Sequence, residues 1–163
     1  MKPVRLILSA LILMLGLGAM AQQPKQLPAF RFFRLDSKAF TNQDIQKGRT
    51  SVFILFDSGC DHCQKEIPKI GKQFDQLAGC SFYFVSFNES DQISAFMRTY
   101  GKDFYGKNNV VVLRDRNREF LPTFFPERFP AVFMYTSAGA LTYYRSGNQD
   151  VASMVRSARL SQK

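Results

Sequence analysis

One stretch of the chain decides the fold, and it reads Phe53-Ile54-Leu55-Phe56-Asp57-Ser58-Gly59-Cys60-Asp61-His62-Cys63-Gln64-Lys65-Glu66-Ile67-Pro68. The apolar run 51–56 predicts a central strand that is covered on both faces. A short turn follows this run, and then apolar residues recur at spacings of three and four, at Ile67, Ile70 and Phe74. That spacing predicts one apolar face of a helix. The sequence therefore predicts a strand, a cysteine pair and a helix in direct succession.

The first cysteine, Cys60, is expected at the N-terminus of this helix. Unpaired N–H groups and the helix dipole both favour an anion at that position. Because the thiolate is the reactive form of cysteine, Cys60 is the predicted reactive thiol. The chain has three cysteines, an odd number that cannot pair completely within one molecule. Cys60 and Cys63 with a distant Cys80 indicate one redox or metal pair and an additional cysteine, and not a disulfide scaffold.

Length and composition indicate one globular domain. The chain has 163 residues, of which 45% are hydrophobic, and such a length suits a single modest core. The formal net charge is +9, but the Lys and Arg residues are scattered along the sequence. Nothing in the sequence resembles a nucleic-acid-binding motif or a basic stripe, so no nucleic-acid partner is expected. The charge is better explained by a solvated basic surface.

The N-terminus predicts export. Lys2 and Arg5 precede the apolar run 6–18, and the small-x-small sequence Ala19-Met20-Ala21 follows. This order is typical of a secretory signal peptide, so residues 1–21 are interpreted as a signal cleaved after about Ala21 and residues 22–163 as the mature, periplasmic domain. The run is shorter than the roughly 20 apolar residues of a spanning helix. The alternative is an uncleaved anchor that tethers the protein to the membrane.

The remaining patterns predict an α/β fold with a central mixed β-sheet flanked by helices. Segment 40–47 is read as a short helix or a loop, and 119–128 is left without assignment because two prolines interrupt it. The predicted strands are 30–35, 51–56, 80–87, 110–113, 131–135 and 141–144. The predicted helices run from the cysteines to about residue 77, then over 91–100 and 150–160.

The sequence Cys60-Asp61-His62-Cys63-Gln64-Lys65-Glu66-Ile67-Pro68 resembles the C-x-x-C-x-x-E-x-P signature of TlpA/ResA-type thiol–disulfide oxidoreductases, which belong to the thioredoxin-like superfamily. The resemblance covers about residues 27–162. It implies a thioredoxin-like fold in which Cys60 attacks and Cys63 resolves the mixed disulfide. It also implies a cis peptide bond at Pro130, opposite the cysteines, because proline is the residue at which a cis bond costs little.

The resemblance also implies the partners. Substrates would be protein or peptide disulfides and thiols, a membrane protein would be the redox partner, no bound cofactor would be needed, and a monomer is expected. The direction of electron flow depends on two residues between the cysteines, which have opposite effects on the stability of the Cys60 thiolate. His62 would stabilise the Cys60 thiolate and favour an oxidant or isomerase, or it could be a solvated turn residue. Asp61 opposes it, since a carboxylate disfavours a nearby anion, and the family pattern favours a reductase.

Two departures from the pattern affect the proton transfer and the groove. Many thioredoxins hold a buried acid six positions before the first cysteine, and here that position is Ile54. The proton of Cys63 must then pass to another group. Glu66 is the first candidate and a third tuning residue, with Asp57 and water as others, although Glu66 could be an ordinary surface residue. Phe129, before the proline, is bulky and would narrow the substrate groove.

Other functions are less well supported. Cys60, His62, Cys63 and Cys80 are soft ligands, but their spacing does not match the paired ligands of structural zinc sites, so no metal is expected. Peroxiredoxin chemistry needs Thr or Ser three residues before the reactive cysteine, where this chain has Asp57.

Two features allow a simpler reading. A redox-silent binding module could use the Phe-rich segment 120–129, for which core and groove wall are the preferred interpretation. Cys80 begins a buried strand and is interpreted as a small hydrophobic filler, with a third redox thiol as the alternative.

Overall fold

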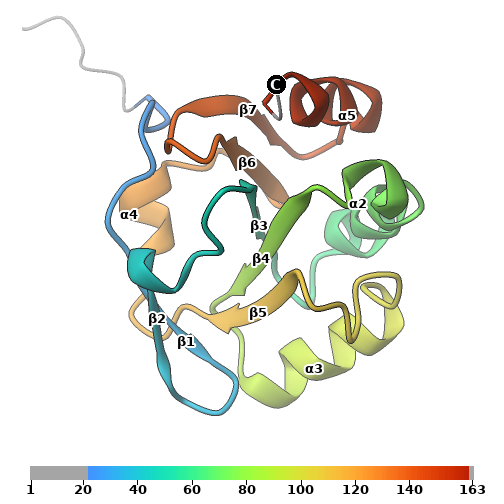
Figure 1. Ribbon diagram of the computed structural model, residues 1–163. Helices are drawn as coiled ribbons and strands as arrows, with labels where there is room; N and C mark the ends of the chain where they lie inside the picture. The colour runs from blue at the N-terminus through green and yellow to red at the C-terminus, as the bar shows by residue number, and fades with distance from the viewer. Residues whose placement is uncertain (1–21, 162–163) are drawn as a thin grey trace, which may run out of the picture.

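The computed structural model describes residues 22–161, and within this range the chain forms a seven-stranded mixed sheet (Figure 1). The strand order is β2-β1-β5-β4-β3-β6-β7. Strands β3, β4 and β5 are parallel, whereas β6 runs antiparallel to β3, β7 to β6, and β1 to both β5 and β2. The strands are β1 Arg31–Arg34, β2 Ala39–Thr41, β3 Thr50–Leu55, β4 Cys80–Ser86, β5 Val110–Arg114, β6 Ala131–Tyr135 and β7 Leu141–Ser146. The predicted signal peptide, 1–21, lies outside the described residues.

Helices cover both faces of this sheet, as predicted. The two parallel crossovers place α2 (Asp61–Gly71) and α3 (Ser90–Thr99) on the same face, because such connections share one hand. Helix α5 (Val151–Leu160) joins them there, and α4 (Phe120–Phe124) covers the opposite face (Figure 1). Two short 3₁₀ helices, η1 Asn42–Asp44 and η2 Phe74–Leu77, complete the fold.

The sheet separates two hydrophobic cores, and β3 contributes to both. Val52 and Ile54 point to the core beneath α2, α3 and α5, whereas Phe53 and Leu55 point to the core beneath α4. No residue of β3 is exposed, which confirms the prediction of a strand covered on both faces. In the second core the rings of Phe120 and Phe124 stack with centroids 4.2 Å apart. Phe120 and Phe124 thus belong to the core, whereas Leu121 and Phe125 of the same segment are exposed.

Three segments differ from the predicted elements. Within 40–47 the expected short helix is present as η1, but the first two residues belong to β2, because the chain reverses at Ser37 with φ of 70° and pairs with β1. Helix α2 ends at Gly71, before the predicted end. After it the backbone hydrogen bonds span three residues instead of four, and Gln73 N donates to Ile70 O at 3.0 Å. Segment 119–128 holds α4, which accepts Pro122 in its first turn because no backbone donor is needed there.

Candidate active site

Cys60 and Cys63 lie at the start of α2, as predicted. Cys60 is the N-cap residue, and its sulfur accepts a hydrogen bond from the backbone N–H of Cys63 at 3.4 Å. Both side chains are thiols in this structure. Cys60 is partly exposed, whereas Cys63 is fully buried against the core. An incoming sulfur can therefore reach Cys60 first, and Cys63 stands behind it one helical turn away.

Cys63 holds its proton tightly. Burial raises the pKa of the Cys63 thiol far above its ordinary value, since a thiolate loses hydration there. A backbone hydrogen bond from Asp57 partly offsets this effect, whereas the hydrogen bond with Cys60 and the negative charges of Cys60 and Asp57 add to it. Cys63 therefore needs a proton acceptor before it can act as a nucleophile.

Asp57 is fixed at the end of β3 beside both cysteines. Its Oδ1 accepts hydrogen bonds from Gly59 N at 2.9 Å and from Asn88 Nδ2 at 3.3 Å. Asn88 Oδ1 in turn accepts from Ser58 N at 2.9 Å. The turn that carries Cys60 is thus tied to the loop after β4, because parallel strands end at the same edge of the sheet. Asn88 is not among the site residues that the sequence predicts.

Glu66 is buried and ionised. It is 3% exposed, so the interpretation as an ordinary surface residue is wrong. Its carboxylate accepts from Lys69 Nζ at 2.6 Å and from the backbone N–H of Gln149 at 2.9 Å. Burial opposes the charge, but these two hydrogen bonds outweigh it and hold the pKa of Glu66 below its ordinary value. A carboxylate so engaged is a poor proton acceptor for Cys63.

Pro130 follows a cis peptide bond, as the resemblance implies. Its carbonyl accepts hydrogen bonds from Gly147 N at 2.9 Å and from Gln149 Nε2 at 3.3 Å. Ala131 pairs with Leu55 in the β3–β6 ladder, which places Pro130 beside the beginning of the cysteine turn. Since Gln149 also contacts Glu66, this residue connects α2 with the proline loop. Nothing in the sequence around Gln149 indicates that role.

A hollow of about 360 Å³ lies between the start of α2, the residues before Pro130 and the end of β7 with the loop that follows it. His62, between the two cysteines, and Phe129, before the proline, both line it. The ring of Phe129 also packs edge-to-face on Phe87, with centroids 5.7 Å apart. Phe129 thus borders a hollow near the cysteines, and its expected role in narrowing a substrate groove stays a prediction. His62 and Asp61 are both exposed.

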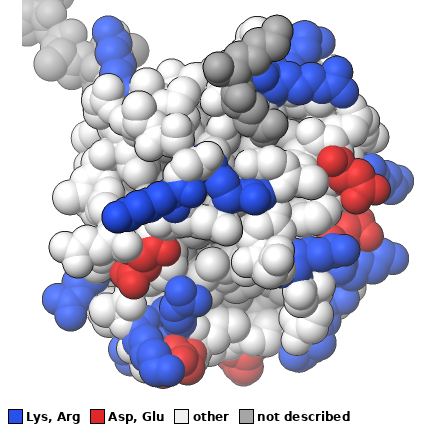
Figure 2. Space-filling view, in the orientation of Figure 1, with Lys and Arg blue, Asp and Glu red and all other residues white. Residues whose placement is uncertain are grey.

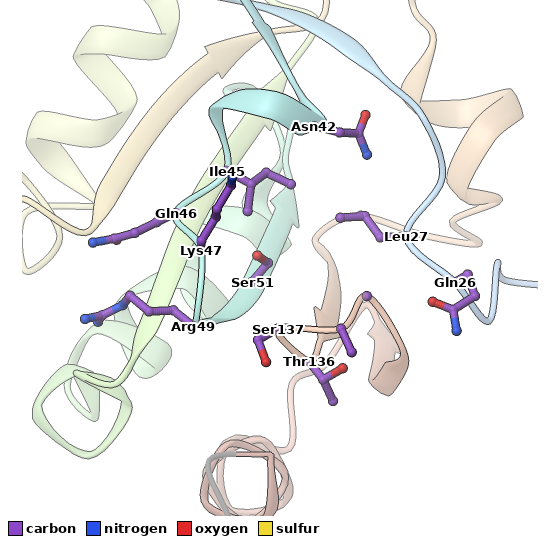
Figure 3. Close-up of a pocket in the computed structure, with 12 residues that line it drawn as sticks. Gln26, Leu27, Asn42, Ile45, Gln46, Lys47, Arg49, Ser51, Thr136 and Ser137 are labelled. Carbon is purple, nitrogen blue, oxygen red and sulfur yellow. The ribbon is translucent and has the colours of Figure 1, made fainter.

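Several other features lie away from this site. Cys80 is fully buried and pairs with Thr50, at the opposite end of β3 from the cysteine turn, which favours the filler interpretation. A second hollow of about 490 Å³, drawn in Figure 3, also lies at that end. Its labelled side chains include Ser51 from β3, Lys47 and Arg49 just before it, and residues of the β6–β7 turn (Figure 3). This hollow is therefore separate from the cysteines.

Residues 22–161 were expected to hold no metal site and no nucleic-acid-binding stripe, and three features of this range concern those expectations and membrane insertion. No group of three or more His, Cys, Asp or Glu side chains in this range could hold a metal ion. No helix in the same range is long and apolar enough to cross a membrane. On the face drawn in Figure 2, Lys and Arg are dispersed and Asp and Glu lie among them, without a continuous basic stripe.

Comparisons with known proteins agree with this geometry. The model of the AhpC/TSA family matches residues 24–143, which include Cys60, Cys63 and Pro130. A search of curated protein sequences finds no match.

Solved structures with the same fold are similar over most of the chain. MTB dsbF has a TM-score of 0.68 and 19% identity, with 86% of this chain and 99% of that one covered. A thioredoxin-family thiol:disulfide interchange protein from Chlorobium tepidum TLS has a TM-score of 0.66 and 21% identity, with 88% and 100% covered. A peroxiredoxin-like protein from Aquifex aeolicus has a TM-score of 0.68 and 14% identity, with 88% and 90% covered. The chain belongs to the AhpC/TSA family, and its fold is that of the thioredoxin-like superfamily.

Proposed function

We propose that the chain is an exported thioredoxin-like oxidoreductase that exchanges disulfides with protein substrates through Cys60 and Cys63. The observation that carries this proposal is the asymmetry of the pair. Cys60 is accessible at a helix N-cap and accepts an N–H hydrogen bond, whereas Cys63 is buried with a raised pKa. Cys60 can therefore attack the substrate first, and Cys63 can react after Cys60 has formed a mixed disulfide.

The reducing half-reaction has two exchange steps. The Cys60 thiolate attacks one sulfur of the substrate disulfide, a mixed disulfide forms, and the other substrate sulfur leaves as a thiolate that takes up a proton. Cys63 then loses its proton and attacks Cys60 Sγ, and the second substrate sulfur leaves in the same way. The substrate gains two electrons and two protons, and a disulfide remains between Cys60 and Cys63.

Asp57 is the proton acceptor that we assign to the second step. Its charge acts on Cys63, and its carboxylate is fixed by hydrogen bonds from Gly59 and Asn88. Glu66 has a different task, because Lys69 and Gln149 already occupy its oxygens. We assign to it the positioning of the Pro130 loop against α2, through which it would tune the redox pair from a distance.

Direction and compartment are part of the same proposal. We assign a reducing role, with the membrane redox partner returning the pair to the dithiol state, because the TlpA/ResA-type signature and the adjacent carboxylate of Asp61 both favour reduction. His62, which is exposed in the first turn of α2, would moderate this poise. The signal-like residues 1–21 support export to the periplasm, and a monomer is sufficient for the chemistry described.

The family also raises peroxide reduction as a second candidate, since one similar structure is described as peroxiredoxin-like. The carboxylate of Asp57 lies where peroxiredoxin chemistry needs a hydroxyl, and its negative charge would repel peroxide-derived charge. We therefore favour disulfide exchange. Hydrogen peroxide turnover by the reduced protein, at rates that exceed its disulfide reduction, would reverse this choice.

The decisive experiment has two parts. Equilibrating the mature protein with glutathione gives the potential of the cysteine pair, and a value near thioredoxin's (about −270 mV) supports reduction, whereas one near about −120 mV supports oxidation. A Cys63→Ala variant should then trap substrates as mixed disulfides on Cys60. The matched control is Cys60→Ala, which should trap none. Equal capture by both variants, or by neither, would overturn the assignment.

A further inference from the structure

The hollow beside the cysteine turn has an unusual charge. Besides His62 and Phe129, it is lined by Arg128 and Arg145, and no carboxylate is among its lining residues. Its volume of about 360 Å³ lies within the range of ligand-binding pockets, roughly 300–1,000 Å³. His62 lies two residues after Cys60, in the first turn of α2, so the hollow borders the end of the helix that carries Cys60.

Neither arginine is neutralised by a salt bridge. The salt bridges within residues 22–161 join Lys38 to Asp36, Lys69 to Glu66 and Arg114 to Glu89. Arg128 and Arg145 are both exposed, so their guanidinium groups can meet an anion that arrives from solvent. An arginine fork matches a carboxylate in geometry as well as in charge.

The fold positions both side chains. Arg145 Nε donates to Asn148 O at 2.9 Å, which fixes one edge of the guanidinium within the β7–α5 loop. The Cδ atom of Arg128 lies 3.7 Å from the place where a Cβ on Gly147 would be, so its stem runs along that glycine. Gly147 has φ of +70° and donates its N–H to Pro130 O. Both arginines thus contact the β7–α5 loop, which also donates a hydrogen bond to the carbonyl of Pro130.

The carboxylates nearby are already engaged or lie outside the lining. Asp150, whose charge Arg145 influences, caps α5 by accepting from Ser153 N at 3.0 Å and Ser153 Oγ at 2.6 Å. Glu66 is paired with Lys69. Asp61 is exposed on α2 next to His62 but does not line the hollow. The two arginines therefore line the hollow without a carboxylate among the other lining residues.

We infer that the hollow between Phe129 and the β7–α5 loop is a substrate subsite that binds a carboxylate near the substrate's reactive cysteine, through Arg128 and Arg145. This inference rests on the proposed disulfide exchange at Cys60 and adds the class of substrate, namely acidic protein segments. The carboxylate can come from an Asp or Glu side chain or from a chain terminus.

The test uses disulfide-linked model peptides that differ at one position beside the cysteine, which is Glu, Gln or Lys, each with an amidated C-terminus. A fourth peptide carries Gln and a free C-terminal carboxylate after the cysteine, to distinguish the two sources. The reduced mature protein should reduce the Glu peptide about tenfold faster in kcat/KM than the Gln peptide, equivalent to about 1.4 kcal/mol. The Lys peptide should be slowest, and about 0.3 M salt should compress these ratios.

Two variants complete the test. The double variant Arg128→Gln/Arg145→Gln should bring the Glu-to-Gln rate ratio close to one. The matched control, Arg31→Gln, removes an exposed arginine from β1 near the other edge of the sheet and should keep the ratio. Equal rates for the Glu and Gln peptides in the unmodified protein would overturn the inference while disulfide exchange stands. Reduction of none of the peptides would overturn both.

Discussion

The contact between Glu66 and Gln149 allows a quantitative prediction, which the Glu66→Gln variant tests. Glutamine has nearly the same shape as glutamate, so the change removes the charge without opening a cavity. In the folded protein the carboxylate is 3% exposed and accepts from Gln149 N at 2.9 Å and Lys69 Nζ at 2.6 Å. The substitution therefore weakens two contacts that connect α2 with the Pro130 loop.

The expected loss of unfolding free energy follows from these contacts. A hydrogen bond to a charged group contributes about 1.5–3 kcal/mol and a neutral one about 0.5–1.5 kcal/mol, so neutralising the acceptor of the Gln149 bond costs about 1 kcal/mol. The pair with Lys69, whose side chain is 57% exposed, adds about 0–1 kcal/mol. Glu66→Gln should thus destabilise the protein by about 1–2 kcal/mol at pH 7.

The pH dependence has a definite sign. Because the pKa of Glu66 is lower in the folded protein than the unfolded reference of 4.5, its charge stabilises the fold above that pH. This contribution is lost as the pH falls through the folded-state pKa. The difference in unfolding free energy between the unmodified protein and Glu66→Gln should therefore have its full value at pH 7 and should become smaller below pH 4.5.

Urea unfolding of both proteins, followed by circular dichroism at pH 7 and at several values below 4.5, measures this difference. Glu127→Gln is the matched control, since Glu127 is exposed and should change stability by less than about 0.5 kcal/mol. Equal stability of Glu66→Gln and the unmodified protein at pH 7 would refute the role of Glu66. So would a deficit that stays constant down to low pH.

Three further predictions test the site and the core. In quenched-flow measurements, Asp57→Asn should slow the resolution of the mixed disulfide about 100-fold at pH 7, and this loss of rate should become smaller as the pH rises. An unchanged rate would exclude Asp57 as the proton acceptor. In the native reduced protein Cys80 should resist alkylation until denaturant is added, because it is fully buried, and labelling as fast as that of Cys60 would contradict this. Phe104→Ala should lower the free energy of unfolding by about 3–5 kcal/mol, measured by thermal or urea unfolding, because the ring is fully buried. Tyr105→Ala should lower it little, because Tyr105 is exposed, and similar losses for both variants would contradict the described packing.

The elements around the cysteines could be predicted because their signals are local. The run 51–56 is apolar enough to require cover on both faces, and a turn and a helix pattern follow it directly. The cis bond at Pro130 came from the family resemblance and is confirmed. Strand β2 could not be predicted, because it has only three residues and Phe40 is its one large apolar side chain, which is too short a pattern to recognise. Its conformation depends on the pairing with β1.

The polar connections of the site could not be predicted, because they join residues far apart in the sequence. Asn88 contacts Asp57 across 31 positions, and Gln149 contacts Glu66 across 83. The helix pattern left a surface position open for Glu66, although it lies four residues before the buried Ile70 on α2. Its hydrogen-bond partner depends on how the β7–α5 loop packs, which no local pattern encodes.

The central claim is that the sulfurs of Cys60 and Cys63 alternate between a dithiol and a disulfide. Counting alkylated thiols by mass in the denatured Cys80→Ala variant, after oxidation with glutathione disulfide and again after reduction, measures this directly. Two labels should be added to the reduced protein, none to the oxidised protein, and two again after re-reduction. Two labels under every condition would mean that the pair does not form a disulfide, and the proposed exchange reaction would then be wrong.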